Sequence, residues 1–292
     1  MLARVDVAIP AAARLGEGPR WNPHTERLLW VDIEGRAVHV SDPATGDDRA
    51  IPVWSRVGCA SWTTDESTVL VALADRLALL DLRDESLTTL VEVPHAGHMR
   101  TNDGICDPAG RFWVGSMALD ESPGVAALYR YADGVLERVL HGLTLSNGIG
   151  WSPDTRLMYY VDSGERRLDV FDFDLEHGTL AGRRVFAEVE HAAGIPDGLA
   201  VDDEGCVWLA LWGGHTVRRY APDGELLDAL DVPAEKVTAC CFGGADRRSL
   251  FITTAEPDGN VYVTQAGVSG SAARFFHASS GTPPDAEPAS AR

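Results

Sequence analysis

A motif that recurs six times along the chain constrains its fold more than any other feature. In each copy, an apolar strand is followed by turn residues such as Asp-Pro or Asp-Gly, and then by a second strand rich in Trp, Val, Leu and Tyr. The first strands of the copies begin near Trp21, Trp62, Cys106, Trp151, Val201 and Phe242. The copies are therefore about 40 to 50 residues apart, which is the period of a four-stranded propeller blade.

Six such repeats account for nearly the whole chain and predict an all-β fold, a six-bladed β-propeller of four-stranded antiparallel blades around a central channel. We expect residues 1–278 to form this single domain, and residues 279–292, rich in Ser, Pro and Ala, to be a disordered tail. A propeller must close to protect its strand edges. We therefore expect the alternating segment 3–9 to pair with the last blade, near residues 260–263 or 273–276.

The composition narrows the possible partners and the location. A net charge of -19 argues against a nucleic-acid partner, because no Lys/Arg cluster is present to neutralise phosphates. No segment has the apolar length of a membrane span, and residues 1–10 lack the apolar region of a signal peptide. We expect a cytoplasmic protein without membrane contact, and a monomer because a propeller closes on itself. The five cysteines, without a CxxC pair, are expected to be buried, reduced thiols.

Four oxygen-bearing side chains directly precede a glycine where successive repeats begin: Glu17, Asp103, Asn147 and Asp197. Asn-Gly and Asp-Gly are ordinary turn dipeptides, but their recurrence at equivalent positions, and a Glu where turn chemistry does not require one, favour a shared site. In a propeller, Glu17, Asn147 and Asp197 would meet at one mouth of the channel. Such an all-oxygen ligand set suits Ca²⁺, Mg²⁺, Mn²⁺ or a similar divalent ion.

The segments around these residues resemble the ordered motifs of the regucalcin (senescence marker protein) and gluconolactonase family. The resemblance extends from about residue 14 to about residue 265 and is carried by Leu15-Gly16-Glu17-Gly18-Pro19, Arg100-Thr101-Asn102-Asp103-Gly104, Leu145-Ser146-Asn147-Gly148, Ile195-Pro196-Asp197-Gly198 and Trp212-Gly213-Gly214. It implies a six-bladed propeller that hydrolyses sugar lactones with one divalent metal ion in the channel. The identity of that ion stays open among Ca²⁺, Zn²⁺, Mn²⁺, Mg²⁺ and Fe²⁺.

The resemblance also assigns roles to individual residues. It implies that Glu17, Asn147 and Asp197 are the metal ligands, that Asp197 is also the catalytic base, and that Arg100 and Asn102 bind the sugar. Asp103 would orient the loop. The family often has a Glu after a Gly-Thr-Met-like stretch. This chain has Asp120 there, with Glu121 beside it, so the acidic substrate-binding position is assigned to Asp120 with Glu121 as its alternative.

Opening a lactone requires a polarised carbonyl, a water nucleophile and a base, which a divalent ion and an adjacent carboxylate provide. The expected reaction is hydrolysis of an aldono-1,4- or 1,5-lactone, such as gluconolactone, xylonolactone or arabinonolactone, to the aldonic acid. The alternatives are an organophosphate or other ester hydrolase on the same fold, and a calcium-binding regulatory propeller. A zinc site at His95 and His98 is less favoured, because their segment has the composition of a loop. The tryptophans of the strands are expected to pack between blades, with Trp212 at the channel as the exception.

Overall fold

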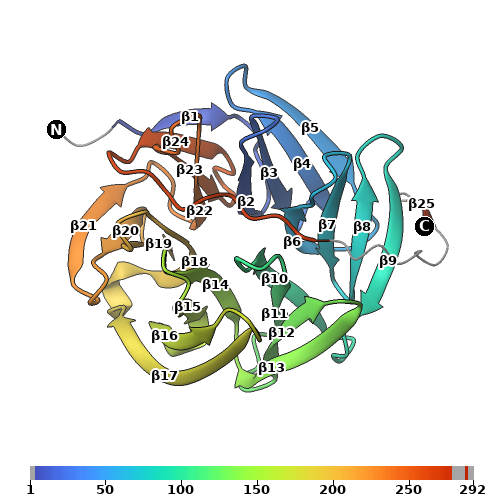
Figure 1. The fold of residues 1–292 in the computed structure, drawn as a ribbon. Helices are drawn as coiled ribbons and strands as arrows, with labels where there is room; N and C mark the ends of the chain where they lie inside the picture. Colours follow the sequence, from blue (N-terminus) through green and yellow to red (C-terminus); the bar gives the residue numbers. More distant parts are fainter. Residues whose placement is uncertain (1–3, 278–286, 289–292) are drawn as a thin grey trace.

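The computed structural model describes residues 4–277 and 287–288, and it confirms the predicted all-β, six-bladed β-propeller. Six antiparallel sheets form a ring around a central channel (Figure 1). Five sheets have four strands, and a short additional strand gives the remaining sheet five.

Each blade begins with its innermost strand, and the strands then follow outward in chain order. Blade 1 contains β2 (Gly16–Asn22), β3 (Arg27–Asp32), β4 (Ala37–Asp42) and β5 (Asp47–Pro52); blade 2 contains β6 (Val57–Trp62), β7 (Thr68–Leu73), β8 (Arg76–Asp81) and β9 (Ser86–Glu92); blade 3 contains β10 (Met99–Cys106), β11 (Phe112–Ala118), β12 (Ala126–Ala132) and β13 (Val135–Leu143). Blade 4 contains β14 (Ser146–Trp151), β15 (Leu157–Asp162), β16 (Arg167–Asp174) and β17 (Thr179–Glu188); blade 5 contains β18 (Ile195–Val201), β19 (Val207–Trp212), β20 (Thr216–Tyr220) and β21 (Leu226–Asp231); blade 6 contains β22 (Val237–Gly243), β23 (Ser249–Thr254), β24 (Val261–Gln265) and β1 (Asp6–Ile9).

The ring closes through the N-terminal strand, as predicted. Strand β1 lies outermost in blade 6 and pairs antiparallel with β24, with Val7 opposite Tyr262 (Figure 1). The last blade is therefore built from both ends of the chain, and this shared blade closes the ring.

Residues 273–276, the other candidate partner for that closing strand, have a different position. They belong to residues 269–277, here called the strap. The strap crosses the mouth of the channel at which the innermost strands end (Figure 1). The Ser271 amide donates to the Val201 carbonyl in blade 5, and the Phe276 amide donates to the Trp62 carbonyl in blade 2. The strap thus bridges opposite sides of the ring.

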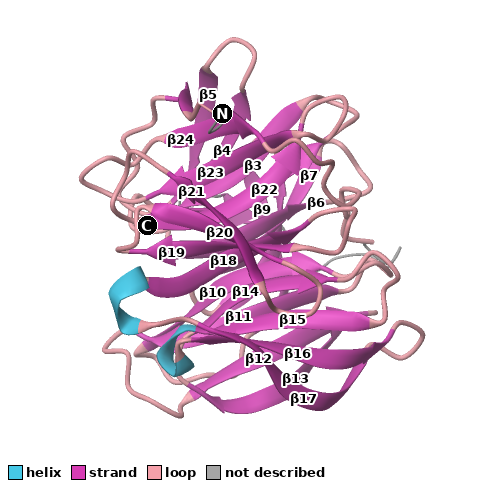
Figure 2. Ribbon diagram, turned by 90° about the vertical axis from the view of Figure 1, so that its left-hand side faces the viewer, coloured by secondary structure: helices cyan, strands magenta, loops and turns pink. Residues whose placement is uncertain are grey.

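Helical structure in the described residues is limited to two 3₁₀ turns, η1 (Ser163–Glu165) and η2 (His191–Ala193), which Figure 2 shows in cyan. No helix in the described part of the chain has the length and hydropathy that crossing a bilayer requires. The tail expected at residues 279–292 lies outside the described residues, except that β25 (Glu287–Pro288) pairs with β9.

The core lies between neighbouring blades, where the strand tryptophans pack as predicted. Trp30, Trp113 and Trp151 are fully buried. In blades 3 and 5, a buried Asp in the first turn accepts a hydrogen bond from the indole of the second strand, over 3.0 Å from Trp113 to Asp107 and 2.9 Å from Trp208 to Asp202. All five cysteines are buried and free, as expected from their number and spacing.

Every innermost strand contains a β-bulge near its beginning, and this shared irregularity positions the site. One extra residue interrupts the pairing of the first and second strands in all six blades. In blade 4 it falls between Ser146 and Ile149, and in blade 5 between Pro196 and Leu199. A bulge redirects side chains that regular pairing would send to the faces of the sheet, so Asn147 and Asp197 are free to face the channel.

Candidate metal and substrate site

One cavity at the mouth of the channel where the inner strands begin brings together most of the residues singled out from the sequence. It has a volume of about 200 Å³, and its lining includes Glu17 from β2, Arg100 and Asn102 from β10, Asn147 from β14 and Asp197 from β18. These side chains come from four blades. The predicted convergence of Glu17, Asn147 and Asp197 is thus present in the structure, together with the predicted Arg100/Asn102 pair.

Two aspartates fix the backbone that leads to Glu17 and to Asn147. Asp32, at the end of β3, accepts hydrogen bonds from the amides of Arg14 and Leu15 at 2.9 and 3.0 Å. Asp162, at the end of β15, accepts the equivalent bonds from Thr144 and Leu145 at 3.0 and 2.9 Å. Because each clamped segment ends two residues before Glu17 or Asn147, the clamp sets where that side chain enters the channel.

Two of the carboxylates that line the cavity, Glu17 and Asp197, are buried. Glu17 and Asp197 are 7% and 5% exposed. Burial, and then the charge of Asp103, raises the pKa of Glu17 from its ordinary value of 4.5 to about 8. Burial, and then the charge of Glu17, raises the pKa of Asp197 well above its ordinary range. In the absence of a cation, this pair therefore retains protons that exposed carboxylates would lose.

Oxygen atoms without partners point to what the cavity can hold. Asn147 Oδ1 and Asp197 Oδ1 are both buried and accept no hydrogen bond from any residue that the structure describes. Buried acceptors without partners are rare and costly. A hard divalent cation satisfies such acceptors and neutralises the carboxylates beside them. The donor set of Glu17, Asn147 and Asp197 therefore fits a divalent metal ion.

Ser163 orients the amide of Asn147, a role that no sequence motif indicated. Asn147 Nδ2 donates to Ser163 Oγ at 3.1 Å, and this hydroxyl donates to the Pro196 carbonyl at 2.7 Å. The amide nitrogen is thereby engaged and the oxygen is left for the cavity. Since Pro196 directly precedes Asp197, one hydroxyl connects the positions of two predicted ligands. A serine after the second strand of a blade carries no recognisable signal for this role.

Arg100 and Asn102 lie on one face of β10, because alternate residues of a strand share a face. Arg100 Nη1 donates to Asn102 Oδ1 at 2.6 Å, and Asn102 Nδ2 donates to the Ser146 carbonyl at 2.9 Å. Thr101 points the other way and donates to the Leu73 carbonyl of blade 2. Burial lowers the pKa of Arg100 to about 10, so the guanidinium stays charged at neutral pH. The cavity therefore has a cationic donor beside its oxygen cluster.

The structure places Asp120 and Glu121 differently. Asp120 is exposed, lies outside the lining of the cavity and accepts a hydrogen bond from the Ser122 amide at 3.1 Å. Glu121, the alternative left open by the sequence, lines the cavity. It has a positive φ of 55°, which turns the chain at this point. Trp212 also lines the cavity, as expected.

Asp103, the fourth residue of the recurring phrase, is engaged elsewhere. It is buried beside the cavity but outside its lining, and its Oδ1 accepts bonds from the Gly104 amide at 2.7 Å and from Arg20 Nη2 at 3.2 Å. A guanidinium thus neutralises the carboxylate that does not face the cavity.

A second acidic group, in the turn between β18 and β19 of blade 5, already holds a cationic side chain of the protein's own. The side chains of Asp202, Glu204 and Cys206 lie close enough together to share a metal ion. However, Arg219 Nη2 lies 2.7 Å from Asp202 Oδ2 and 2.6 Å from Glu204 Oε2. Asp202 additionally accepts bonds from the Glu204 and Cys206 amides. These contacts describe a structural ion-pair cluster, so the channel cavity is the better metal site.

Comparisons with known proteins agree with this geometry. The sequence model of the family described as "SMP-30/Gluconolactonase/LRE-like region" matches residues 15–256. Regucalcin of Danio rerio is 38% identical over 256 residues, covering 86% of each chain, and pentonolactonase XacC of Haloferax volcanii is 38% identical over 256 residues, covering 86% of this chain and 85% of the relative. The solved structure of a calcium-binding protein, regucalcin, from Agrobacterium tumefaciens superposes with a TM-score of 0.89 at 26% identity, covering 96% of this chain and 98% of that one. The chain belongs to the SMP-30/gluconolactonase/LRE-like family.

Proposed function

We propose that the protein is a metal-dependent lactonase that hydrolyses a sugar lactone, an aldono-1,4- or 1,5-lactone, to the aldonic acid. The observation that carries this proposal is the pair of unpartnered oxygens on Asn147 and Asp197, which face a cavity shared with the Arg100/Asn102 pair. The first feature fits a divalent cation, and the second offers donors to a polyhydroxylated substrate. The relatives named as a pentonolactonase and as a putative sugar lactone lactonase support the same substrate class.

Glu17, Asn147 and Asp197 would hold the ion, for which Ca²⁺, Zn²⁺, Mn²⁺, Mg²⁺ and Fe²⁺ are the candidates. When bound, it supplies Lewis-acid polarisation of the lactone carbonyl and lowers the pKa of water. The name of the Agrobacterium relative, a calcium-binding protein, gives Ca²⁺ particular support. All-oxygen sites accept several ions, so the donor set alone favours no single one.

In the proposed reaction, Asp197 accepts a proton as the water oxygen bonds to the carbonyl carbon. The bond from that carbon to the ring oxygen then breaks, and the ring oxygen takes up a proton to become a hydroxyl. Arg100 and Asn102 donate hydrogen bonds that orient the sugar, since a guanidinium offers its donors in a fixed planar fork. Glu121 accepts from a sugar hydroxyl at the rim of the cavity. The product acid ionises at neutral pH, so each turnover releases one proton.

The test is lactone hydrolysis, followed by proton release in weak buffer with glucono-, galactono-, xylono- and arabinono-lactones. Metal-stripped protein is compared with protein refilled with each candidate ion. We expect activity to vanish on stripping and to return with one ion. Asp197→Asn should lower the turnover rate by about 10²- to 10⁴-fold, the usual contribution of a general base. Asp228→Asn, on the exposed outermost strand β21, is the matched control and should behave as wild type.

One outcome would overturn the proposal. If no lactone is hydrolysed with any ion while an ion still binds at Glu17, Asn147 and Asp197, the site is not a lactonase site. A calcium-binding regulatory propeller would then explain the ligand set better, and activity toward organophosphates or other esters would be measured next.

A further inference from the structure

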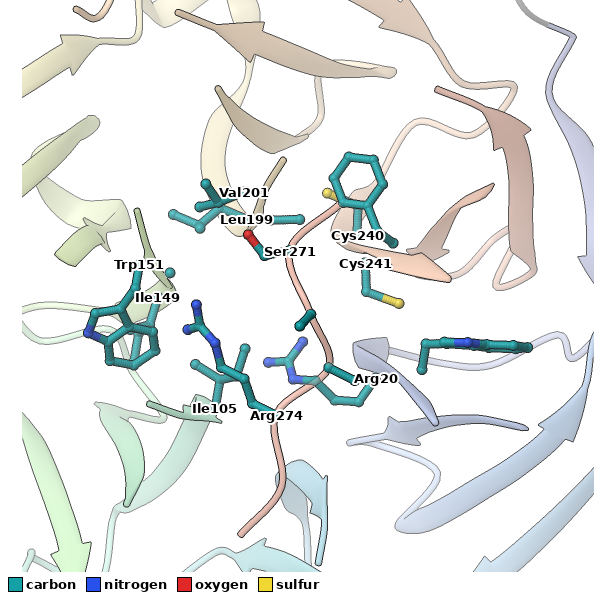
Figure 3. A pocket seen from close by; sticks show the side chains of 16 residues that line it. Arg20, Ile105, Ile149, Trp151, Leu199, Val201, Cys240, Cys241, Ser271 and Arg274 are labelled. Carbon is teal, nitrogen blue, oxygen red and sulfur yellow. The ribbon is translucent and has the colours of Figure 1, made fainter. Parts of the chain in front are cut away.

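A second pocket lies at the other end of the channel, beneath the strap. It has a volume of about 90 Å³ and is lined by inner strands of blades 1, 3, 4, 5 and 6 together with residues 271–274 of the strap (Figure 3). The inner strands run from the metal cavity toward this pocket. On β2, Glu17 lines the cavity proposed to bind the metal ion, and Trp21 lines the pocket beneath the strap. The two residues are four positions apart, which corresponds to roughly 13 Å along a strand. The two sites are therefore distinct.

Two arginines face this pocket from different elements. Arg20 projects from β2 and Arg274 from the strap, and Figure 3 shows both guanidinium groups directed into the pocket. Arg274 lies over Trp151, with its Cζ 4.9 Å from the ring centroid. No described residue forms a hydrogen bond or an ion pair with the Arg274 guanidinium. Arg20 is held by Asp103 and by the carbonyls of Pro19 and Gly104, but its buried Nε has no partner among the described residues.

Among the described residues, the nearby carboxylates of Asp103 and Asp107 already have partners of their own, and the charge of Asp107 acts on Arg274 without a hydrogen bond or ion pair between them. Asp103 is engaged by Arg20, and Asp107 is engaged by Arg111 at 2.6 Å and by the Trp113 indole. The rest of the lining is mainly apolar, and burial raises the pKa of the Cys240 and Cys241 thiols, so both are neutral at pH 7. The hydroxyl of Ser271, a further lining residue, is buried without a partner.

We propose that this pocket binds a small inorganic anion, in the size range from chloride to phosphate, between Arg20 and Arg274. A buried or half-buried cation is costly unless it is paired, and two guanidinium groups that face the same pocket repel each other. An anion relieves both penalties, and guanidinium groups are the side chains best suited to bind it. Water needs roughly 10–15 Å³ by the same measure, so the pocket has room for an ion of several atoms. The anion ties the strap to blade 1.

The first test compares stability with and without the anion. Thermal unfolding is measured at constant ionic strength while chloride, or in a second series phosphate, replaces the bulky anion 2-(N-morpholino)ethanesulfonate. Arg274→Met removes the charge but retains a side chain that packs on Trp151. Arg138→Met, on the exposed outer strand β13, is the matched control. All three proteins keep the metal cavity, so any binding of phosphate there affects them equally.

We expect the midpoint of wild type and Arg138→Met to rise by roughly 2 °C or more as the anion saturates the pocket, because a ligand that binds only the folded state stabilises it. The rise should be lost in Arg274→Met. The ion that acts at the lower concentration is the preferred one. An equal anion dependence in all three proteins would overturn the proposal.

A direct measurement covers the case in which Arg274→Met does not fold. Wild-type crystals soaked in bromide should show an anomalous peak within ion-pair distance of both guanidinium groups. Bromide peaks confined to exposed arginines, as an adventitious ion only, would contradict the proposal.

Discussion

At the residue scale, two adjacent carboxylates beside the cavity proposed to bind the metal ion differ in what they can reach. Both side chains are exposed, but Glu121 lines the cavity, whereas Asp120 lies outside its lining and accepts a hydrogen bond from the Ser122 amide. We predict that Glu121→Gln raises KM for the lactone by about 10-fold, because a hydrogen bond to a charged group contributes about 1.5–3 kcal/mol. Asp120→Asn, the matched control, should change KM less than about 2-fold. Steady-state kinetics of both variants check this, and a larger effect of Asp120→Asn would show that the carboxylates exchange places when substrate binds.

The same pair of residues shows what the sequence could predict of the site. Glu17, Asn147 and Asp197 were recognisable because each precedes a glycine at an equivalent position in its repeat. The choice between Asp120 and Glu121 depends on a single loop residue with positive φ, which reverses the direction of neighbouring side chains and leaves no periodic pattern. Ser163 was not recognisable, because its role depends on contacts with residues 16 and 33 positions away.

At the element scale, the inner strands approach one another so closely that a side chain does not fit between them. Among the glycines that follow the oxygen-bearing residues, Gly18 has a positive φ of 54°, a conformation that permits a sharp turn. Gly148 serves a different purpose, since a Cβ there would lie 2.6 Å from the Asp197 carbonyl oxygen of the next blade. We predict that Gly148→Ala destabilises the metal-free protein by about 1–3 kcal/mol, as overpacking does. It should also weaken metal binding, because the strand that must move carries Asp197.

Urea unfolding and metal titration measure the two effects separately. Gly97→Ala is the matched control, since a Cβ at Gly97 meets nothing within 4 Å and its φ is not in the left-handed region. That variant should stay within about 0.5 kcal/mol of wild type. An unchanged unfolding midpoint for Gly148→Ala would mean that the blades can separate at no cost, and the close-approach explanation would then be wrong.

At the scale of the whole molecule, the ring was predictable and the strap was not. The blades repeat, and closure demands a partner for the last blade, so β1 followed from residues 3–9. Residues 269–277 belong to no repeat, and most of their backbone bonds go to turns of other blades that are far away in sequence. The two apolar residues Phe275 and Phe276 resemble a strand, yet they pack against the hydrophobic clusters between blades 1 and 2 and between blades 2 and 3. Contacts of this kind depend on the finished ring, and no local pattern encodes them.

The buried carboxylates of the channel give the entire fold an unusual dependence on pH. In the metal-free folded protein the pKa of Glu17 is about 8, against an ordinary value of 4.5. Between these pH values the folded state holds a proton that the unfolded chain releases, so stability must fall as pH rises through this window. One such proton is equivalent to at most about 1.4 kcal/mol per pH unit. A bound cation replaces the proton and should remove the decline.

The measurement is urea unfolding at pH 5.5 and pH 8, with chelator and with the preferred ion. We expect wild type with chelator to be less stable at pH 8, and the ion to restore stability most strongly there. Glu17→Gln removes this titrating group and the charge that raises the pKa of Asp197. The stability of the metal-free variant should therefore vary much less with pH. Groups elsewhere titrate equally in both proteins and cancel in the comparison. If Glu17→Gln loses as much stability between pH 5.5 and pH 8 as wild type does, the decline arises from groups outside the channel. The explanation that a metal ion stabilises the fold by neutralising these carboxylates would then be wrong.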